Sequence, residues 1–411
     1  MNKIAKWSFF SLLVLTASFS EAQNVHGRSW IGLIHRPDSN DIAFTFILDS
    51  SESGQSLVIT NATEKIRVDN IMFRDDSVFI EMPVFESSFK AKVENDSWNG
   101  LWVKGTSAVN QVLPFSAHPA KRRFEINEGN AGYNITGRWQ VSFASDKSKA
   151  EQSVAEFTQK GNIVYGTFLT PSGDYRYQEG VVTDKHLILS GFDGAHAYSF
   201  TADIRNSSRL VNGKFFSGAK NKDTWNAVKT PRAKVSTDAV AMHMKPGEEK
   251  LNFSFTGTDG KSVSINDDQF KNRVVIVQIL GSWCPNCMDE TEFLSDYYNK
   301  NKNRGVEVVA LAYEYSTDFQ RSVASIRKFQ NRFHVQYPIL VTGVKVSDSL
   351  RTEKTLPQVT PIKVFPSSII IDKHGKVRKF DTAFFGPGTG KHFQEYKKEF
   401  SATMEALLNE K

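Results

Sequence analysis

Apolar and polar residues alternate with a period of two over much of residues 23–235. Residues 89–93 (Phe-Lys-Ala-Lys-Val) and 198–202 (Tyr-Ser-Phe-Thr-Ala) are two such stretches. A half-buried antiparallel strand produces this alternation, because successive side chains point to opposite faces of a sheet. No helical period of useful length occurs in the same region. The pattern therefore predicts an all-β fold for residues 23–235.

This all-β region repeats itself. Its halves open with Gly27-Arg28-Ser29-Trp30 and Gly137-Arg138-Trp139, and each ends near a proline, Pro119 or Pro231. Further similar pieces follow in the same order: residues 76–80 match 184–188, and residues 99–102 match 212–215. We therefore expect two β repeats, residues 23–125 and 126–235. A duplicated unit of about a hundred residues fits two small sandwiches or two halves of one barrel.

The pattern changes from residue 251 onward. The apolar run 274–280 predicts a buried strand, and a helix is expected over residues 285–301. The remaining elements predicted are strands at 306–313, 337–341, 368–372 and 377–382, and helices at 317–332 and 391–409. Strands that alternate with helices indicate a covered, largely parallel sheet. The predicted fold class is thus an α/β domain, residues 251–411, preceded by the duplicated all-β region.

Residues 236–250 lack any period and contain Pro246-Gly247, so we interpret them as a linker. Met242-His243-Met244 within this linker is a possible soft ligand set for copper. Incidental sulfur in a flexible segment is the interpretation that we favour.

The N-terminus has the pattern of a secretory signal. Lys3 and Lys6 precede the apolar residues 7–19, and Ser20-Glu21-Ala22 offers a small-residue cleavage site. We expect residues 1–22 to be a signal peptide, and the mature protein to have no stable membrane insertion. The alternative is an uncleaved anchor helix, although the apolar stretch is shorter than the ~20 residues that span a bilayer.

The charge of the chain gives little sign of a nucleic-acid partner. Of 51 basic and 45 acidic residues, Lys3, Lys6 and Glu21 lie in the leader, which leaves 49 and 44, a net charge of +5. This small excess is dispersed, and we interpret the cluster Lys121-Arg122-Arg123 as a solvated linker. Five Asn-x-Ser/Thr sequons would carry glycans only in a eukaryotic secretory route. The short leader and the dithiol described next favour export to the periplasm or cell envelope of a Gram-negative bacterium.

The only two cysteines lie three residues apart, in Trp283-Cys284-Pro285-Asn286-Cys287, directly after the strand 274–280. The positive end of the following helix favours thiolate over thiol at Cys284, the expected nucleophile. A mixed disulfide must be resolved by a second thiol, and Cys287 supplies it one helical turn away. Pro285 suits the first helical turn, and Asn286 adds no charge to the pair, which favours a reducing dithiol. A zinc half-site is a weaker interpretation, because no second cysteine pair exists.

Four features make residues 250–411 resemble thioredoxin-like proteins, and in particular exported disulfide reductases of the TlpA type. They are the hairpin around Asp259-Gly260-Lys261, the strand that runs into the dithiol, a Glu three residues past the second Cys, and residues 365–372 (Phe-Pro-Ser-Ser-Ile-Ile-Ile-Asp). The resemblance implies a thiol-disulfide oxidoreductase with a thioredoxin-like fold. It does not extend to the duplicated β region.

The resemblance also implies roles for individual residues. Glu290 would modulate proton transfer at the buried sulfur, with a raised pKa; the alternative is a surface carboxylate that assists the helix N-terminus. Pro366 would be the cis-proline that faces the dithiol, with Pro357 and Pro361 as competitors for this match. The alternative for Pro366 is an ordinary trans-proline at a strand start. Phe365 would shape the substrate groove, and Pro285 and Asn286 would contact substrate. Trp283 would pack over Cys284 as a lid, although a place in the core fits as well.

The partners implied are disulfide-containing client proteins and a membrane thiol carrier that donates electrons. No nucleic acid, metal or cofactor is expected. Such families serve cytochrome maturation or disulfide repair, and the sequence leaves both open.

Two other functions compete. A peroxiredoxin-like thiol peroxidase shares the fold, but its peroxide site needs a Thr three residues before the reactive Cys and a Pro upstream, where Gly281 and Val277 stand. The second is a binding protein in which the β region does the main work and the dithiol is an accessory. Residues 386–391 (Gly-Pro-Gly-Thr-Gly-Lys) have the wrong spacing for a phosphate loop, and we interpret them as the turn into the last helix.

Overall fold

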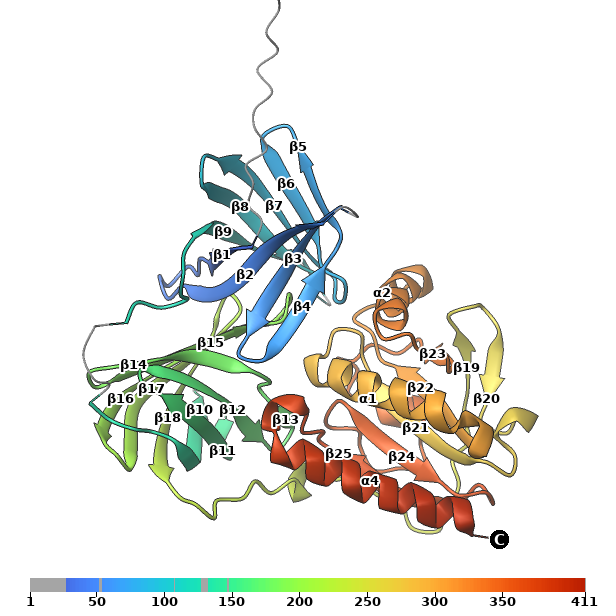
Figure 1. Ribbon diagram of the computed structural model, residues 1–411. Helices are drawn as coiled ribbons and strands as arrows, with labels where there is room; N and C mark the ends of the chain where they lie inside the picture. Colours follow the sequence, from blue (N-terminus) through green and yellow to red (C-terminus); the bar gives the residue numbers. More distant parts are fainter. Residues whose placement is uncertain (1–26, 52–53, 107, 127–131, 146–147, 411) are drawn as a thin grey trace, which may run out of the picture.

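The computed structural model describes residues 27–410 except 52–53, 107, 127–131 and 146–147. The predicted signal peptide lies outside the described residues. Two curled antiparallel sheets come first in the chain, and an α/β domain lies beside them (Figure 1). In the part of the chain that is described, no helix combines the length and apolar character needed to cross a membrane.

The first β unit, residues 28–119, is an antiparallel meander. Its strands are β1 (Arg28–Ile34), β2 (Ile42–Ser51), β3 (Gly54–Asn61), β4 (Glu64–Val68), β5 (Ile71–Arg74), β6 (Ser77–Glu81), β7 (Ser87–Glu94), β8 (Ser97–Lys104) and β9 (Gln111–Pro119). Pairing of β1 with β9 curls the sheet, and β4 and β5 form its two ends. The alternating inward side chains build an aromatic core that includes Trp30, Phe44, Phe89 and Trp98.

The second β unit, residues 137–229, closes on itself. Its strands are β10 (Gly137–Ser145), β11 (Ser148–Lys160), β12 (Ile163–Thr170), β13 (Gly173–Asp174), β14 (Gln178–Thr183), β15 (His186–Phe192), β16 (Ala197–Asn206), β17 (Arg209–Ser217) and β18 (Asn221–Lys229). The pairings β10–β18 and β11–β12 join the sheet into a barrel.

The predicted all-β, duplicated region is confirmed. The repeated residues take equivalent places: Trp30 lies in β1 and Trp139 in β10, and both are buried. Each half forms a barrel-like sheet of its own, so the two halves of one barrel that we considered are not what forms. Nine strands suffice to curl around one core, because a barrel of about eight strands is already filled by its side chains.

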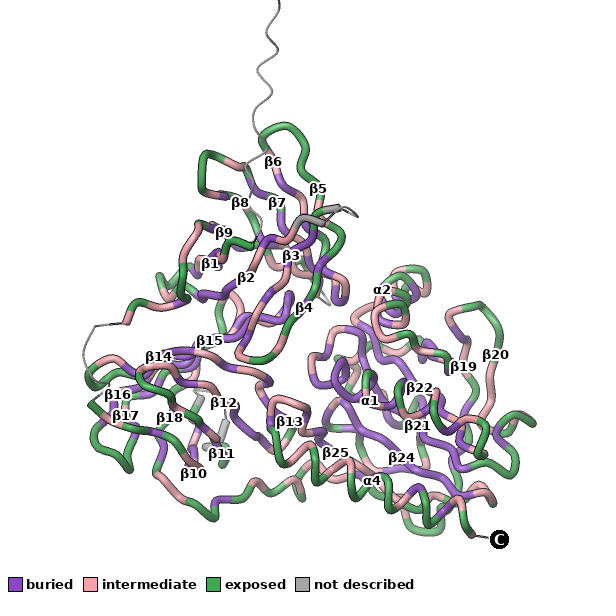
Figure 2. The backbone as a smooth tube through the Cα atoms, viewed as in Figure 1, coloured by how far each residue is buried: buried purple, intermediate pink, exposed green. Residues whose placement is uncertain are grey.

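The α/β domain has the predicted thioredoxin-like fold. Its sheet contains β19 (Ser254–Gly257), β20 (Ser262–Ser264), β21 (Val274–Leu280), β22 (Val306–Ala312), β23 (Ile339–Val341), β24 (Ser367–Ile371) and β25 (Val377–Thr382), and its α-helices are α1 (Pro285–Asn301), α2 (Phe319–Arg332), α3 (Arg351–Thr355) and α4 (Lys391–Asn409). The strand order is β20-β19-β23-β22-β21-β24-β25, so β22 is the central strand and β21 lies beside it in the interior of the sheet. Figure 2 shows how continuously β21, β22 and β24 are buried.

The expectation of a largely parallel sheet was wrong. Only the β21–β22 and β22–β23 pairs are parallel, and the other pairings of this sheet are antiparallel. Two hairpins, β19–β20 and β24–β25, supply the outer strands, and a tight turn can join only antiparallel neighbours. Each hairpin also joins the sheet antiparallel to its inner neighbour, β19 to β23 and β24 to β21.

Two segments that we interpreted as linkers are packed. Met242 is buried in the core of the α/β domain, so its thioether is not free to bind copper. The backbone of Met244 pairs with that of Val359 in an isolated antiparallel β-bridge. Arg123 is buried between the β units and is no solvated residue. Its guanidinium donates to Ser190 O at 2.7 Å and to Thr60 O at 2.5 Å, which joins the two units.

Candidate functional site

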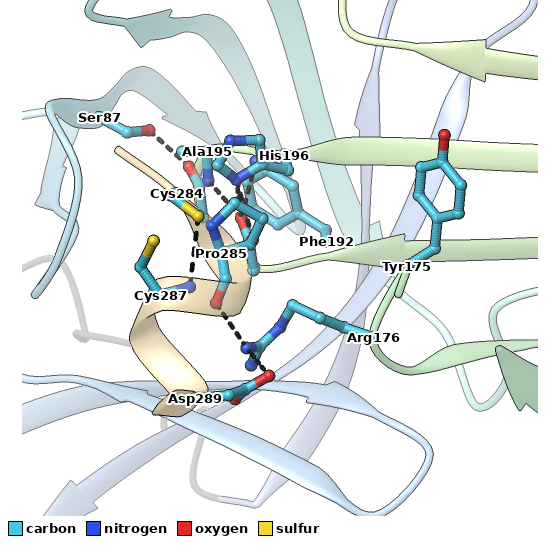
Figure 3. A network of polar contacts seen from close by, with 12 residues as sticks. Ser87, Tyr175, Arg176, Phe192, Ala195, His196, Cys284, Pro285, Cys287 and Asp289 are labelled. Carbon is cyan, nitrogen blue, oxygen red and sulfur yellow. Dashed lines mark hydrogen bonds and ion pairs between the residues drawn. The ribbon is translucent and has the colours of Figure 1, made fainter. Parts of the chain in front are cut away.

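The dithiol lies where β21 meets α1. The cysteine Cys284 is the residue that caps α1, and its sulfur accepts a hydrogen bond from the backbone N–H of Cys287 at 3.3 Å (Figure 3). Pro285 follows at the first helical position, where its missing N–H costs nothing. The order strand, cap, helix therefore places both sulfurs at one helix N-terminus, as the sequence predicts.

Phe365 and Pro366 face this dithiol from the segment that directly precedes β24. The peptide bond between them is cis, which separates Pro366 from its competitors Pro357 and Pro361. The thiol of Cys284 lies 3.5 Å from Phe365 O and donates to it. The ring of Phe365 packs edge-on against Trp283, with 5.5 Å between the ring centroids.

Trp283 is half-buried beside the nucleophile. Its indole N–H donates to Tyr313 O at 2.8 Å, and the ring stacks on Tyr315. The indole also fills the space that a side chain at position 281 would need. The peroxide-binding Thr of a peroxiredoxin therefore has no room at this position.

Glu290 is buried behind Cys287, so the alternative of a surface carboxylate is wrong. Its side chain accepts hydrogen bonds from Gln278 Nε2 at 2.9 Å and Ser368 Oγ at 3.0 Å. Burial raises the pKa of Glu290 to about 7, against the opposing effect of these two hydrogen bonds. Burial likewise raises the pKa of Cys287, and the charge of Glu290 adds to this. A carboxyl that titrates near neutrality can exchange a proton with the resolving thiol.

The comparisons with known proteins agree with this geometry. Residues 245–396 match the family Redoxin. The thiol-disulfide oxidoreductase ResA of Bacillus anthracis is 28% identical over 159 residues, which cover 38% of this chain and 80% of that protein. ResA of Bacillus subtilis strain 168 is 25% identical over 136 residues, which cover 33% of this chain and 66% of that protein.

Residues 245–396 form a redoxin domain. The protein is a thiol-disulfide oxidoreductase with a thioredoxin-like domain, distantly homologous to ResA. Among solved structures, a thiol:disulfide interchange protein of the thioredoxin family from Chlorobium tepidum is 18% identical, with a TM-score of 0.31, and covers 41% of this chain and 100% of that one. A thiol-disulfide oxidoreductase from Bacteroides fragilis is 19% identical, with a TM-score of 0.27, and covers 36% of this chain and 99% of that one.

The second β unit reaches the first turn of α1 in the redoxin domain. Arg176 donates to Pro285 O at 3.0 Å and forms an ion pair with Asp289 (Figure 3). It forms a second ion pair with Glu64 of the first β unit. Asn286 is only 8% exposed and donates to Asp174 Oδ2 at 3.1 Å. One buried guanidinium thus joins three parts of the molecule at the dithiol helix.

In this network three carboxylates, those of Glu64, Asp174 and Asp289, lie near the guanidinium of Arg176. Burial raises the pKa of Asp289, the Arg176 charge opposes that rise, and the charges of Asp174 and Glu64 add to it. Burial also raises the pKa of Asp174. A buried ion pair of this kind stabilises only while every partner stays in place, because removing one leaves an uncompensated charge.

The dithiol itself is covered in this arrangement. Cys284 is 3% exposed and Cys287 0%. Val84 and Phe85 of the first β unit and Ala195 of the second belong to the same apolar cluster as the two cysteines. A cavity of about 10 Å³, room for about one water molecule, remains beside Trp283, between Phe85, Ala195 and Glu314.

The structure brings the eight sequence-predicted site residues together at the dithiol, and their catalytic or substrate-binding roles stay predictions. Sequence reasoning missed Arg176, Asp174, Phe85 and Ala195, all of which come from the β units. No local motif marks these residues. Among the described residues, no cluster of three or more metal-ligating side chains occurs.

Proposed function

We propose that the protein is an exported reductase of protein disulfides, with Cys284 as nucleophile and Cys287 as resolving thiol. One observation carries the proposal: Cys284 Sγ caps α1 and faces the Phe365 carbonyl, with the buried Cys287 behind it. A client disulfide brought to this carbonyl would meet the nucleophile and a backbone acceptor together.

The exchange proceeds in two steps. The Cys284 thiolate attacks one client sulfur, the client disulfide breaks, and the departing client thiolate takes up a proton. Cys287 then loses its proton, for which Glu290 is the nearby carboxylate base, and its sulfur attacks Cys284. The second client thiol leaves, the client disulfide is reduced, and the 284–287 disulfide is formed. A membrane thiol carrier would return two electrons and two protons.

The proposed location is the periplasm or cell envelope, and it rests on the leader-like residues 1–22. The proposed clients are disulfide-containing proteins, which the name of the relative ResA supports. Fractionating cells that express the full chain, with and without residues 2–22, tests the location. Retention of the full chain in the cytoplasm would contradict export.

A side-by-side assay tests the chemistry. The reduced protein should reduce insulin disulfides stoichiometrically and should leave hydrogen peroxide largely unconsumed. Cys284→Ser should abolish insulin reduction, whereas Cys287→Ser should accumulate mixed disulfides through Cys284. Preferential consumption of peroxide, or reduction by Cys284→Ser at the wild-type rate, would contradict the proposal.

A further inference from the structure

Residues 82–86, the loop between β6 and β7 (Met-Pro-Val-Phe-Glu), pack against the redoxin domain, where Phe85 and Glu86 line a small cavity with Trp283, the neighbour of Cys284. Val84 and Phe85 are 1% and 3% exposed, and they pack in the cluster that contains Cys284. The apolar core of the first β unit includes Met82 but neither of these two. The side chains at the tip of the loop therefore pack in the core of the redoxin domain and not in the core of the first β unit, to which the loop belongs.

The backbone of Phe85 is strained to achieve this. Its φ is +67°, a left-handed conformation that bulky residues avoid. Such strain persists where surrounding contacts hold the residue, and it gathers at binding and switch regions. The ring of Phe85 packs edge-on against His196, with 5.1 Å between the ring centroids.

His196 belongs to the equivalent loop of the second repeat, because β6–β7 and β15–β16 are matching hairpins. Ala195 of that loop lies in the dithiol cluster as well (Figure 3). Ser87 Oγ donates to Gly194 O at 2.5 Å, which holds the two loops together. The duplication thus brings two corresponding loops onto one dithiol.

Glu86 gives the loop a charged end. Its carboxylate pairs with Arg321 of α2 at 2.6 Å and accepts from Ser325 Oγ at 2.8 Å. The redoxin domain thus offers apolar side chains, among them Trp283 and Phe365, together with the cation Arg321. The loop matches this surface with the apolar Val84 and Phe85 followed by the carboxylate of Glu86.

We infer that residues 82–86 occupy in cis the surface to which a client polypeptide binds in trans. The inference rests on the proposed function. Cys284 is 3% exposed and shares an apolar cluster with Val84, Phe85 and Ala195, so a polypeptide disulfide can reach the sulfur only after this packing has opened. Once the loop has moved away, the exposed surface should prefer client segments whose side chains resemble those of the loop. Preferred client segments carry an apolar residue, an aromatic residue and an Asp or Glu in succession.

Two variants of the full chain open the contact without touching the dithiol. Phe85→Gly removes the aromatic contact and suits the positive φ, so the barrel should keep its fold. Glu86→Gln weakens the pair with Arg321. Asp75→Gly is the matched backbone control, because Asp75 also has positive φ and lies in the exposed turn between β5 and β6.

Alkylation of Cys284 by iodoacetamide and reduction of insulin are then measured. Both should accelerate about fivefold in Phe85→Gly and Glu86→Gln, and neither in Asp75→Gly. Faster alkylation without insulin reduction would support the internal contact and contradict the proposed function. Unchanged alkylation in both variants, with wild-type insulin reduction intact, would overturn the inference.

A peptide experiment tests the selectivity. The peptide Met-Pro-Val-Phe-Glu, blocked at both ends, should inhibit insulin reduction by Phe85→Gly, and Met-Pro-Val-Phe-Gln should inhibit about fivefold more weakly. Adding Arg321→Gln to Phe85→Gly should remove the difference between the peptides. Equal inhibition by both peptides with Arg321 present, or none by either, would overturn the predicted client chemistry.

Discussion

The indole of Trp283 lies against the α-carbon of Gly281. A Cβ at position 281 would stand 2.2 Å from Trp283 Nε1 and 2.4 Å from Cε2, well inside contact distance. The ring cannot easily withdraw, because its N–H is held by Tyr313 O and its face by Tyr315. Trp283 can occupy this position only because residue 281 has no side chain.

We predict that Gly281→Ala lowers the free energy of unfolding of the redoxin domain by about 1–3 kcal/mol, as overpacking does. The cost should fall sharply when Trp283→Ala is present, because the clash then disappears. Hydrogen exchange of the β21 amides, in the four proteins of this cycle, measures both effects. Additive costs would show that the two residues do not interact.

The raised pKa of Glu290 makes stability depend on pH. The folded value of about 7 lies above the ordinary value of 4.5, so the folded state holds the proton more tightly. This contribution is complete below pH 4.5 and is lost as the pH rises to about 7, roughly 3 kcal/mol in all. Glu290→Gln should make the fall in urea stability between pH 5 and 8 shallower by about this amount, while the raised pKa values of Glu314 and Asp289 keep part of the fall in place. The exposed Glu94, changed to Gln, should leave the fall unaltered.

Glu290→Gln should also lower the pKa of Cys287, because it removes a negative charge that opposes the thiolate. Titration of Cβ-labelled cysteine by NMR measures this. Glu314→Gln is the matched control: burial raises the pKa of Glu314 to about 7 as well, but its carboxyl binds Ser282 N and Oγ. A shift of the Cys287 pKa as large in the control would exclude a specific role for Glu290.

Arg123 should matter more to stability than its neighbour. Arg123→Ala removes a buried guanidinium and leaves the carbonyls of Ser190 and Thr60 without it, at about 3 kcal/mol. Arg122→Ala, at an exposed position, should cost less than about 0.5 kcal/mol. Urea unfolding followed by the fluorescence of the buried tryptophans in the β units compares the two. Equal losses of unfolding free energy in the two variants would mean that the hydrogen bonds of Arg123 do not hold the two β units together.

The sequence predicted those parts of the site that depend on neighbours along the chain. The apolar run into Trp-Cys-Pro-Asn-Cys places Cys284 at a helix N-terminus, and one helical turn separates it from Cys287. Glu290 follows at the same spacing, which puts it on the same helix face. The mixed character of the sheet was missed, because the outer strands come from hairpins whose partners periodicity does not specify.

The sequence by itself therefore determined the strands of the duplicated region, the α/β domain and its dithiol, because local periodicity and cap chemistry act over a few residues. Only the tertiary structure decided that Arg176 donates to Pro285 O, or that Val84 and Phe85 join the apolar cluster around Cys284. These contacts join residues more than a hundred positions apart and depend on how whole units pack. An alternating strand pattern says which side chains face inward, and it leaves open what the loops between strands will meet.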